Sequence, residues 1–373
     1  MTAEEEESNL AQIAERHKVS APLVFYLVHS TQFGIGVLGF QKNVVKYAGH
    51  DSWISVILIG LIVHLYIWMI YQILKRSSGS LMTLQHDLFG KWVGNGLNIV
   101  WIIYFFLGSC AILIGYIEIL KVWMFEDLNI WIYTAIFMGL LYYIFNGGFR
   151  VVTGFAFFGV VLPLWIFLTF LIFPTRFADL QHLLPIMDHS PQEIFMGTMQ
   201  MVITVIGFET LFLYYPFVKN IDKSQKWAHI GNLFTTCSYI IIMIVSIVYY
   251  SAEEEILRNK WATLAMWKIV ELPFVERFEY IGIASWSLVI LPNICVMLWS
   301  AKRGITEIFG ITEKKVIISV LVVMFFIVNV IVDKEDIQLL NKIINMYALG
   351  IVFCYIPVLY LITFVRDLWK RRT

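Results

Sequence analysis

Charged residues are scarce in this chain of 373 residues. Asp, Glu, Lys and Arg make up 14% of it, whereas 59% is hydrophobic and the mean hydropathy is +0.76. Soluble globular proteins carry about 25% charged residues. Because a water-facing fold could not bury this much apolar side chain, the composition predicts a protein embedded in a lipid bilayer. Basic and acidic residues balance at 27 each, so no basic surface for nucleic acid is indicated.

Cysteine is scarce as well, with four residues, and three common local motifs of enzymes are missing. No glycine loop for phosphate, histidine pair with metal-ligand spacing or nucleophile elbow is found. The sequence therefore predicts no catalytic residue, no metal and no cofactor. Each cysteine lies in an apolar stretch, where we expect a buried, small packing residue and no disulfide. The four are Cys110, Cys237, Cys295 and Cys354.

Long apolar stretches are abundant. A membrane-spanning helix needs about 20 mostly apolar residues, and ten stretches of the chain fit this length. They cover residues 20–42, 52–74, 92–120, 128–149, 151–173, 192–218, 227–250, 279–301, 316–332 and 343–365. An even number places both termini on one side of the membrane. Basic residues favour the segments on that side, so the positive-inside rule predicts cytoplasmic termini.

The stretches form a single membrane domain, because no segment between them is long enough to build a core of its own. We expect a cytoplasmic N-terminal tail at 1–19 and a first group of five helices at 20–173. A second group of five follows at 192–365, and a short cytoplasmic tail at 366–373 ends the chain.

Two stretches are interrupted by glycine at corresponding positions. The first contains "FGIGVLG" with Gly34 and Gly36, and the sixth contains "VIGFET" with Gly207. Glycine lowers helix stability by about 1 kcal/mol relative to alanine. Inverted five-helix repeats place their substrate site at discontinuous helices of this kind. The pattern predicts an all-α membrane protein of ten helices, built as a five-plus-five inverted repeat with discontinuous helices 1 and 6.

An unwound turn survives in a bilayer only where it faces protein or a water-filled cavity. There, freed N–H groups can bind a carboxylate and freed carbonyls can bind an ammonium group. The breaks at Gly34 and Gly207, with Gln32 beside the first, therefore indicate a site for a ligand such as an amino acid. The alternative is that Gly34 and Gly36 only permit close packing of helices.

Glu209 is the most costly residue to place in the membrane. A buried carboxylate needs a partner or a proton, so Glu209 is a candidate to bind a ligand amine, to exchange a proton, or to tie the broken helix to a neighbour. Other small or polar residues near the middle of a stretch could line the same cavity. These are Tyr104, Gly108, Pro292 and Asn293.

Several motifs resemble the B subunit of spore germinant receptors, a family placed in the amino acid–polyamine–organocation transporter superfamily. The motifs are "FGIGVLGF", "LFGKWVG", "GFETLFLYYPF", "VERFEY" and "SAKRGITEIFGI". The resemblance extends over essentially the whole chain, and it implies a LeuT-like fold.

The resemblance implies a protein of the spore inner membrane that recognises a small germinant such as an amino acid, sugar or nucleoside. Its partners would be the receptor A subunit and the lipoprotein C subunit. By position, the implied pocket involves Gly34, Tyr104, Gly108, Ile206, Gly207, and Pro292 or Asn293. Gly108 would enlarge this pocket relative to valine, and Pro292 replaces a hydroxyl-bearing residue type. The resemblance therefore does not identify the ligand.

A charged cluster, "ERFE", precedes the eighth stretch. Glu276, Arg277 and Glu279 at a helix start form a local ion pair and cap in the simpler interpretation. The alternative is a contact with another subunit, or a lid over the cavity.

Three functions remain open at this stage. The first is a receptor that binds a nutrient and signals to partner subunits, and the family resemblance favours it. The second is a proton- or sodium-coupled amino-acid transporter, in which Glu209 would carry the proton. The third is a membrane scaffold whose pocket has no function.

Overall fold

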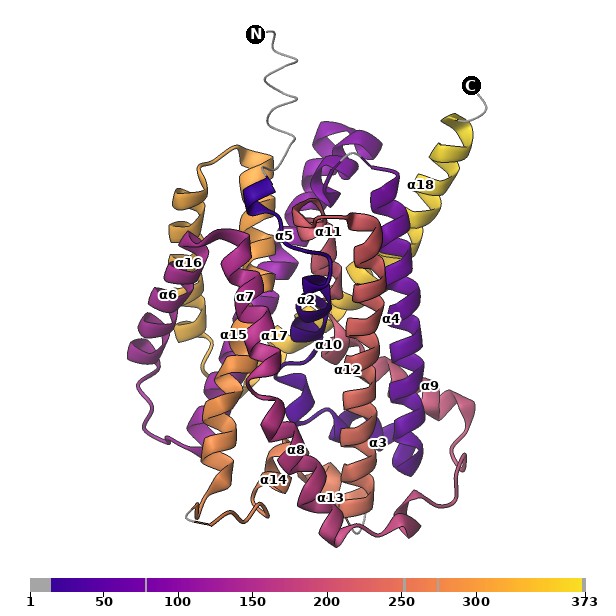
Figure 1. Ribbon diagram of the computed structural model, residues 1–373, viewed down its shortest axis with the longest axis vertical. Coiled ribbons are helices and arrows are strands. Elements are labelled where there is room, and N and C mark those ends of the chain that lie inside the picture. Colours follow the sequence, from indigo (N-terminus) through magenta and orange to yellow (C-terminus); the bar gives the residue numbers. More distant parts are fainter. Residues whose placement is uncertain (1–14, 78, 251–252, 274, 371–373) are drawn as a thin grey trace.

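The computed structural model describes residues 15–77, 79–250, 253–273 and 275–370. The first 14 residues of the predicted N-terminal tail and residues 371–373 of the C-terminal tail lie outside the described residues. The described chain is built of helices that run mostly along the long axis of the molecule (Figure 1). A short helical turn, η1 (Glu15–His17), and the end of α18 (Ile356–Lys370) lie at the same end of the bundle.

The first predicted interruption is present. Helix α2 (Leu23–Gln32) ends before a non-helical segment at 33–35, which is followed by the 3₁₀ turn η2 (Gly36–Leu38) and helix α3 (Gln41–Ala48). The break thus falls at the glycine-rich motif, where the intrinsic preference for helix is lowest.

The second predicted interruption is present as well. Helices α9 (Pro191–Gln200) and α10 (Val202–Val205) end before Gly207, and η6 (Phe208–Thr210), α11 (Leu211–Tyr214) and η7 (Tyr215–Phe217) follow. Gly207 has φ +119°, a backbone conformation that L side chains rarely adopt. The prediction of discontinuous helices 1 and 6 is confirmed.

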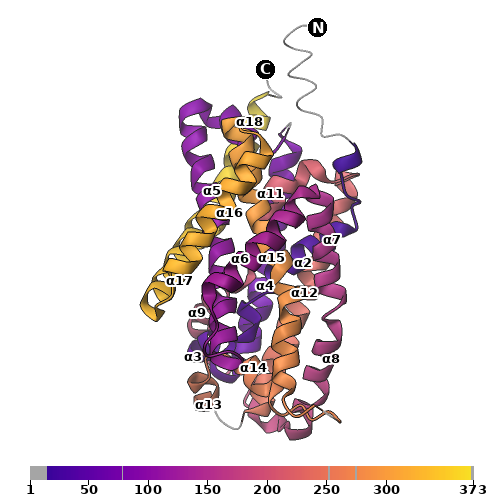
Figure 2. The same ribbon diagram turned by 90° about the vertical axis from the view of Figure 1, so that its left-hand side faces the viewer.

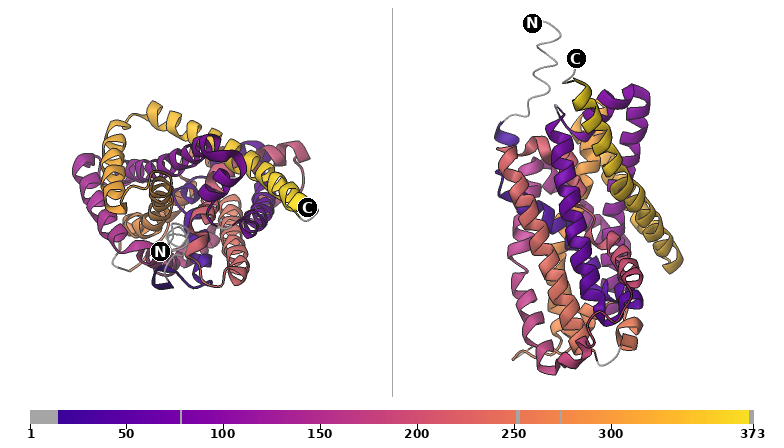
Figure 3. Two further views of the ribbon diagram at one scale, coloured as in Figure 1. Left: turned by 90° about the horizontal axis from the view of Figure 1, so that it is seen from above. Right: turned by 90° about the vertical axis from the view of Figure 1, so that its right-hand side faces the viewer.

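Four long helices pack against the interrupted segments, and Figure 3 shows the bundle from above. They are α4 (Ser52–Lys75), α5 (Leu81–Trp123), α12 (Ile221–Tyr249) and α15 (Phe278–Phe309). Helix α5 packs along α15, and α12 packs against both α2 and α4. Helix α5 begins earlier than the predicted stretch because the Ser80 side chain caps it, and it bends at Gly90, where φ is +74°.

The remaining helices cover the outside of this core. Pro163 divides the predicted fifth stretch into two helices, as expected for a residue that lacks the N–H donor. Helix α17, the π-helical segment η8 and α18 slant along one side of the bundle (Figure 2). The bounds are α6 (Ile130–Asn146), α7 (Gly148–Val161), α8 (Leu164–Ile172), α16 (Glu313–Val330), α17 (Lys334–Tyr347) and η8 (Ala348–Tyr355).

Short helical segments occupy the end of the molecule away from the end of α18, near the start of α4 (Figure 1). They include α13 and α14 between α12 and α15, and three 3₁₀ turns. Their bounds are η3 (Gly49–Asp51), η4 (Pro174–Phe177), η5 (Leu180–Leu183), α13 (Glu253–Arg258) and α14 (Ala262–Trp267).

Six helical stretches among the described residues are long and apolar enough to cross a membrane. Four predicted spans are not among the six. The breaks divide the first and sixth into short helices, the fourth corresponds to the shorter helix Ile130–Asn146, and the ninth corresponds to Glu313–Val330. The count of ten therefore stays a prediction. Large apolar side chains such as Leu61, Ile136 and Val330 are exposed on outer helix faces, as expected in contact with lipid.

The four cysteines are free, but their predicted burial is only half right. Cys110 and Cys295 are buried, whereas Cys237 and Cys354 are exposed. The prediction is wrong for the latter two because the outer surface of a membrane protein is as apolar as its core. Hydropathy along the chain cannot distinguish these two environments.

Candidate binding site between the interrupted helices

The two breaks lie against each other. The Gln32 side-chain N–H group donates to the Val205 carbonyl at 3.1 Å. A Cβ atom added to Gly36 would lie 2.9 Å from the Thr204 methyl, and one added to Gly207 would lie 2.6 Å from the Thr31 carbonyl oxygen. At Gly207 the close neighbour is backbone and φ is +119°, so glycine is needed there, whereas at Gly36 only the Thr204 side chain limits the space.

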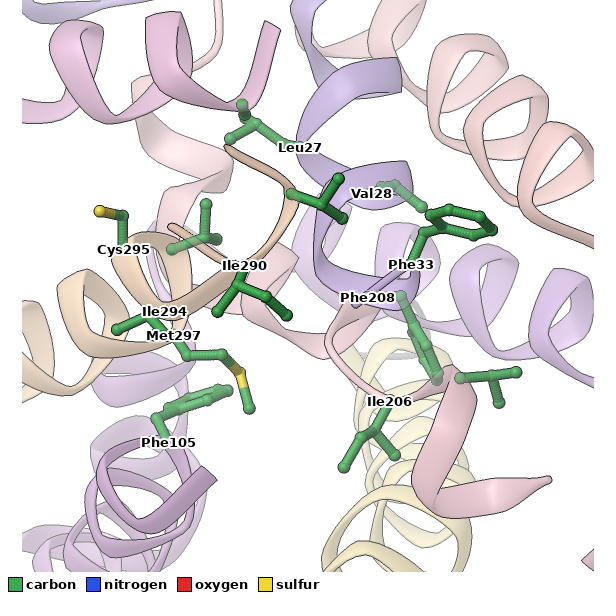
Figure 4. Packing of buried hydrophobic residues seen from close by; sticks show 14 of the residues in the cluster. Leu27, Val28, Phe33, Phe105, Ile206, Phe208, Ile290, Ile294, Cys295 and Met297 are labelled. Carbon is green, nitrogen blue, oxygen red and sulfur yellow. The ribbon is translucent and has the colours of Figure 1, made fainter. Parts of the chain in front are cut away.

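A cavity of about 500 Å³ opens beside this contact. Its volume lies in the range of about 300–1,000 Å³ that is usual for small-molecule sites. Residues of both interrupted segments line it, together with residues of α5 and α15. Figure 4 shows Ile206 facing Met297 and Phe105 from the opposite side of this region. The predicted site residues in the lining are Gln32, Gly34, Gly36, Gly108, Ile206 and Asn293.

Two side-chain amides supply the polar character of the cavity near the first break. Gln32 is 1% exposed, and its N–H₂ group donates to Val205 and to the Asn232 side chain, each at 3.1 Å. Its Oε1 atom has no hydrogen-bond partner in the described part of the chain. The Asn293 amide lies directly against Gly34. A buried acceptor without a partner costs about 1–3 kcal/mol, so a ligand N–H or O–H donor at Gln32 would be stabilising.

Several peptide groups at the breaks are already bound by side chains of the protein. Tyr239 donates its hydroxyl to the Gln32 carbonyl at 3.0 Å, and the Trp286 indole N–H donates to the Gly34 carbonyl at 3.4 Å. The Gly207 N–H donates to the Glu209 carboxylate at 2.8 Å. The sequence did not predict these partners. These three peptide groups are therefore not free to bind a ligand, in contrast to the expectation for an unwound turn.

The Glu209 carboxylate is fully buried beside the cavity and not among its lining residues. It accepts the Tyr104 hydroxyl at 2.7 Å as well as the Gly207 N–H. One carboxylate thus joins the second break to α5. Of the three predicted roles, this geometry favours the tie between the broken helix and its neighbour.

Two further predicted residues lie on α15 and α5. Pro292 faces α7, where a Cβ on Gly159 would lie 2.5 Å from its ring. It is not among the residues that line the cavity, unlike its neighbour Asn293. Gly108 faces Met297, whose methyl would lie 2.6 Å from an added Cβ. Substitution of Gly108 would thus force Met297 to move, and it would narrow the cavity on that side.

Sequence reasoning missed an ion pair between two residues that line the cavity. The Glu118 carboxylate pairs with the Lys260 ammonium group, which lies 4.6 Å from the centre of the Trp261 ring. Lys260 belongs to a connecting segment, where a single lysine attracts no notice. Glu118 could have been found, because Gly108, Gly115 and Glu118 are spaced to share one face of α5.

The "ERFE" cluster lies at the start of α15, outside the cavity lining. Arg277 donates to the Glu279 carboxylate at 3.0 Å, and its guanidinium lies 3.9 Å from the centre of the Tyr280 ring. Glu276 precedes this pair in an exposed position. The contacts are those of a local ion pair. A subunit contact or lid formed by these residues stays a prediction.

Comparison with known proteins decides the family. The sequence pattern of a family described as "Spore germination protein" matches residues 18–338. Spore germination protein GerQB of Bacillus cereus is 40% identical over 353 residues, which cover 95% of this chain and 98% of that protein. The chain belongs to the spore germination protein family. Within the family, spore germination protein B2 of Bacillus subtilis (strain 168) is 24% identical over 347 residues, or 90% of this chain and 92% of that protein.

Solved structures show the fold that this family member shares. Mhp1, a nucleobase-cation-symport-1 family transporter in a closed conformation, superimposes with a TM-score of 0.66 and 13% identity, covering 97% of this chain and 81% of that chain. A Na⁺-coupled sialic acid symporter superimposes with a TM-score of 0.58 and 14% identity, covering 90% of this chain and 79% of that chain. The predicted LeuT-like, all-α membrane fold is confirmed. Family and fold are those of a permease-like, multi-pass membrane protein and not of an enzyme class.

Proposed function

We propose that this chain is the nutrient-sensing subunit of a spore germinant receptor. It binds a small germinant, an amino acid or a similar molecule, in the cavity between the two interrupted helices. One observation carries the proposal: both interruptions line the same cavity of about 500 Å³. Gln32, one of the lining residues, also has an acceptor, Oε1, without a partner among the described residues.

The lining suggests the chemistry of the ligand. An ammonium or hydroxyl group of the ligand donates to Gln32, while the Asn293 amide can donate to or accept from a second polar group. The apolar part of the ligand then packs against Ile206, Met297 and the open face of Gly108. Such an arrangement fits a small molecule with adjacent polar groups and a short apolar side chain.

Signalling requires that the ligand bind one conformation better than another. A coupling of about 1–3 kcal/mol suffices to link two sites. Because the two breaks are in direct contact, a ligand that bridges them changes how the segments on either side are held. In this proposal the change passes to the receptor A subunit and to the lipoprotein C subunit, in the spore inner membrane, with both termini of this chain in the cytoplasm.

The transporter fold favours a second candidate, a proton- or sodium-coupled amino-acid transporter. An uptake experiment distinguishes the receptor from the transporter. The full chain is placed in proteoliposomes with a sodium gradient or a proton gradient. Radiolabelled L-amino acids, glucose and inosine then serve as probes. A receptor gives saturable binding without accumulation in the lumen. Accumulation that an ionophore abolishes would contradict the receptor and support the transporter.

A matched pair of variants tests whether the probe binds in this cavity. Gln32→Ala should weaken binding of the probe by about tenfold, which corresponds to about 1.4 kcal/mol. Gln181→Ala, at an exposed position in η5, should leave it unchanged. Equal binding by both variants, or no binding of any probe to the unaltered chain, would overturn the proposal.

A further inference from the structure

A second group of polar side chains lies outside the central cavity, at the end of the molecule away from η1. Three segments that are distant in sequence meet there. They are the turn η3 with His50 and Asp51, the residue His189 just before α9, and the first residue of α13, Glu253. One potential ligand atom from each of His50, Asp51 and His189 lies within 4.8 Å of the other two.

The hydrogen bonds fix which nitrogen of each imidazole is free. Asp51 is fully buried, and its Oδ2 lies 3.2 Å from His189 Nδ1. His50 Nε2 lies 2.6 Å from the Pro185 carbonyl oxygen. Because a carboxylate and a carbonyl only accept, His189 Nδ1 and His50 Nε2 carry the protons. The lone pairs therefore lie on His189 Nε2 and His50 Nδ1.

Both lone-pair nitrogens lie near the carboxylate of Glu253. His50 Nδ1 lies 3.5 Å from Glu253 Oε1. A Cβ atom added to Gly49 would lie 2.5 Å from Glu253 Oε1 and 2.6 Å from His189 Nε2. Glu253 Oε1 and His189 Nε2 thus lie on the same side of Gly49, within about 5 Å of each other, and Glu253 Oε1 also faces His50 Nδ1. Gly49 has φ +45°, so the backbone conformation favours glycine there as well.

We propose that His50 Nδ1, His189 Nε2 and Glu253 Oε1 bind one divalent transition-metal ion of the zinc class. Two imidazoles and one carboxylate are ligands that suit such an ion, with a fourth position for water. Asp51 and the Pro185 carbonyl orient the two imidazoles, as carboxylates and carbonyls commonly do at metal-binding histidines. A cavity of about 160 Å³ adjoins the site, lined by His50, Glu253 and His182.

The ion would cross-link the outer parts of both interrupted helices. His50 follows α3, the second half of the first interrupted helix, and His189 precedes α9, which leads into the second break. Glu253 adds α13, which packs on α3. The site is independent of the proposed nutrient binding. Local spacing could not predict it, because its ligands are separated by more than one helix along the chain.

Zinc binding by the full chain tests the site. The chain is purified in detergent, stripped with a chelator and titrated with Zn²⁺ in a calorimeter. We expect one ion per chain, with a higher thermal unfolding temperature in its presence. His189→Asn removes the Nε2 ligand but keeps a side-chain donor for Asp51, and Glu253→Gln removes the carboxylate. Each should weaken Zn²⁺ binding by at least about tenfold.

The neighbouring Glu254→Gln removes the same charge from an exposed position of α13 and should leave Zn²⁺ affinity unchanged. Elution volume and the unfolding temperature without zinc show whether each variant is folded. The proposal is overturned if the unaltered chain binds no stoichiometric zinc. It is also overturned if folded His189→Asn and Glu253→Gln chains bind zinc as tightly as Glu254→Gln does.

Discussion

A chain that carries Gly34→Val should accumulate in the membrane as the unaltered chain does but bind its germinant about 5- to 150-fold more weakly. Gly34 lies in the non-helical segment between α2 and η2, so valine disturbs no helix there. Any Cβ at this position collides with the Asn293 amide. The collision displaces the Asn293 amide from the proposed ligand, and loss of a buried hydrogen bond costs about 1–3 kcal/mol, which corresponds to about 5- to 150-fold in affinity. Binding of radiolabelled probes to membranes, normalised by immunoblot, measures the effect.

The matched control is Gly154→Val in α7. A Cβ at Gly154 would meet nothing within 4 Å, so the same substitution adds the same side chain without a collision. Binding by this variant should equal that of the unaltered chain. Unchanged binding by Gly34→Val, or equal losses in both variants, would remove Gly34 from the binding site.

Glu209→Ala should lower the stability of the folded chain by about 2–6 kcal/mol. The substitution leaves two buried donors, the Tyr104 hydroxyl and the Gly207 N–H, without an acceptor. Each unsatisfied buried donor costs about 1–3 kcal/mol. Because folded proteins are stable by only about 5–15 kcal/mol, we expect a lower thermal unfolding temperature in detergent and less protein in the membrane.

Glu209→Gln distinguishes a structural role, in which Glu209 links the second break to α5, from a role as proton carrier. The glutamine oxygen can accept the Gly207 N–H while its amide group donates to the Tyr104 oxygen, so most of the stability should return. Unaltered germinant binding by this variant identifies Glu209 as a tie. Loss of proton-dependent accumulation alone identifies a proton carrier. A Glu209→Ala chain that unfolds at the temperature of the unaltered chain would contradict the assignment.

The interruptions of the two helices could be predicted because their cause is local. Gly34, Gly36 and Gly207 lower helix stability wherever they occur, and their matching positions in the two halves indicated one shared site. Gln32 and Asn293 could be predicted as well, because a polar side chain stands out in an apolar stretch. Hydrophobic patterning thus gave the membrane class, the breaks and part of the cavity.

The remaining features depend on contacts between distant segments. Tyr239 and Trp286 bind carbonyls of the first break from α12 and α15, and nothing in their local sequence predicts this. The Glu118–Lys260 pair likewise joins a helix to a connecting segment. Exposure to lipid could not be separated from burial at Cys237, since both environments select apolar neighbours. Such features follow from the packing of the bundle and not from any one stretch.

A cysteine cross-link between the two breaks tests the central claim most directly. In a chain whose native cysteines are replaced, Gly36→Cys is combined with Thr204→Cys. A Cβ at Gly36 would lie 3.4 Å from the Thr204 Cβ, close to the separation of about 3.5–4.5 Å in disulfides. Gly36→Cys with Gly154→Cys is the control pair.

We predict that an oxidant joins the first pair in native membranes, that the cross-linked chain no longer binds germinant, and that a reductant restores binding. The control pair should stay reduced. If the first pair also stays reduced, or if the cross-linked chain binds germinant as well as the reduced chain, the two interrupted helices do not form the binding site.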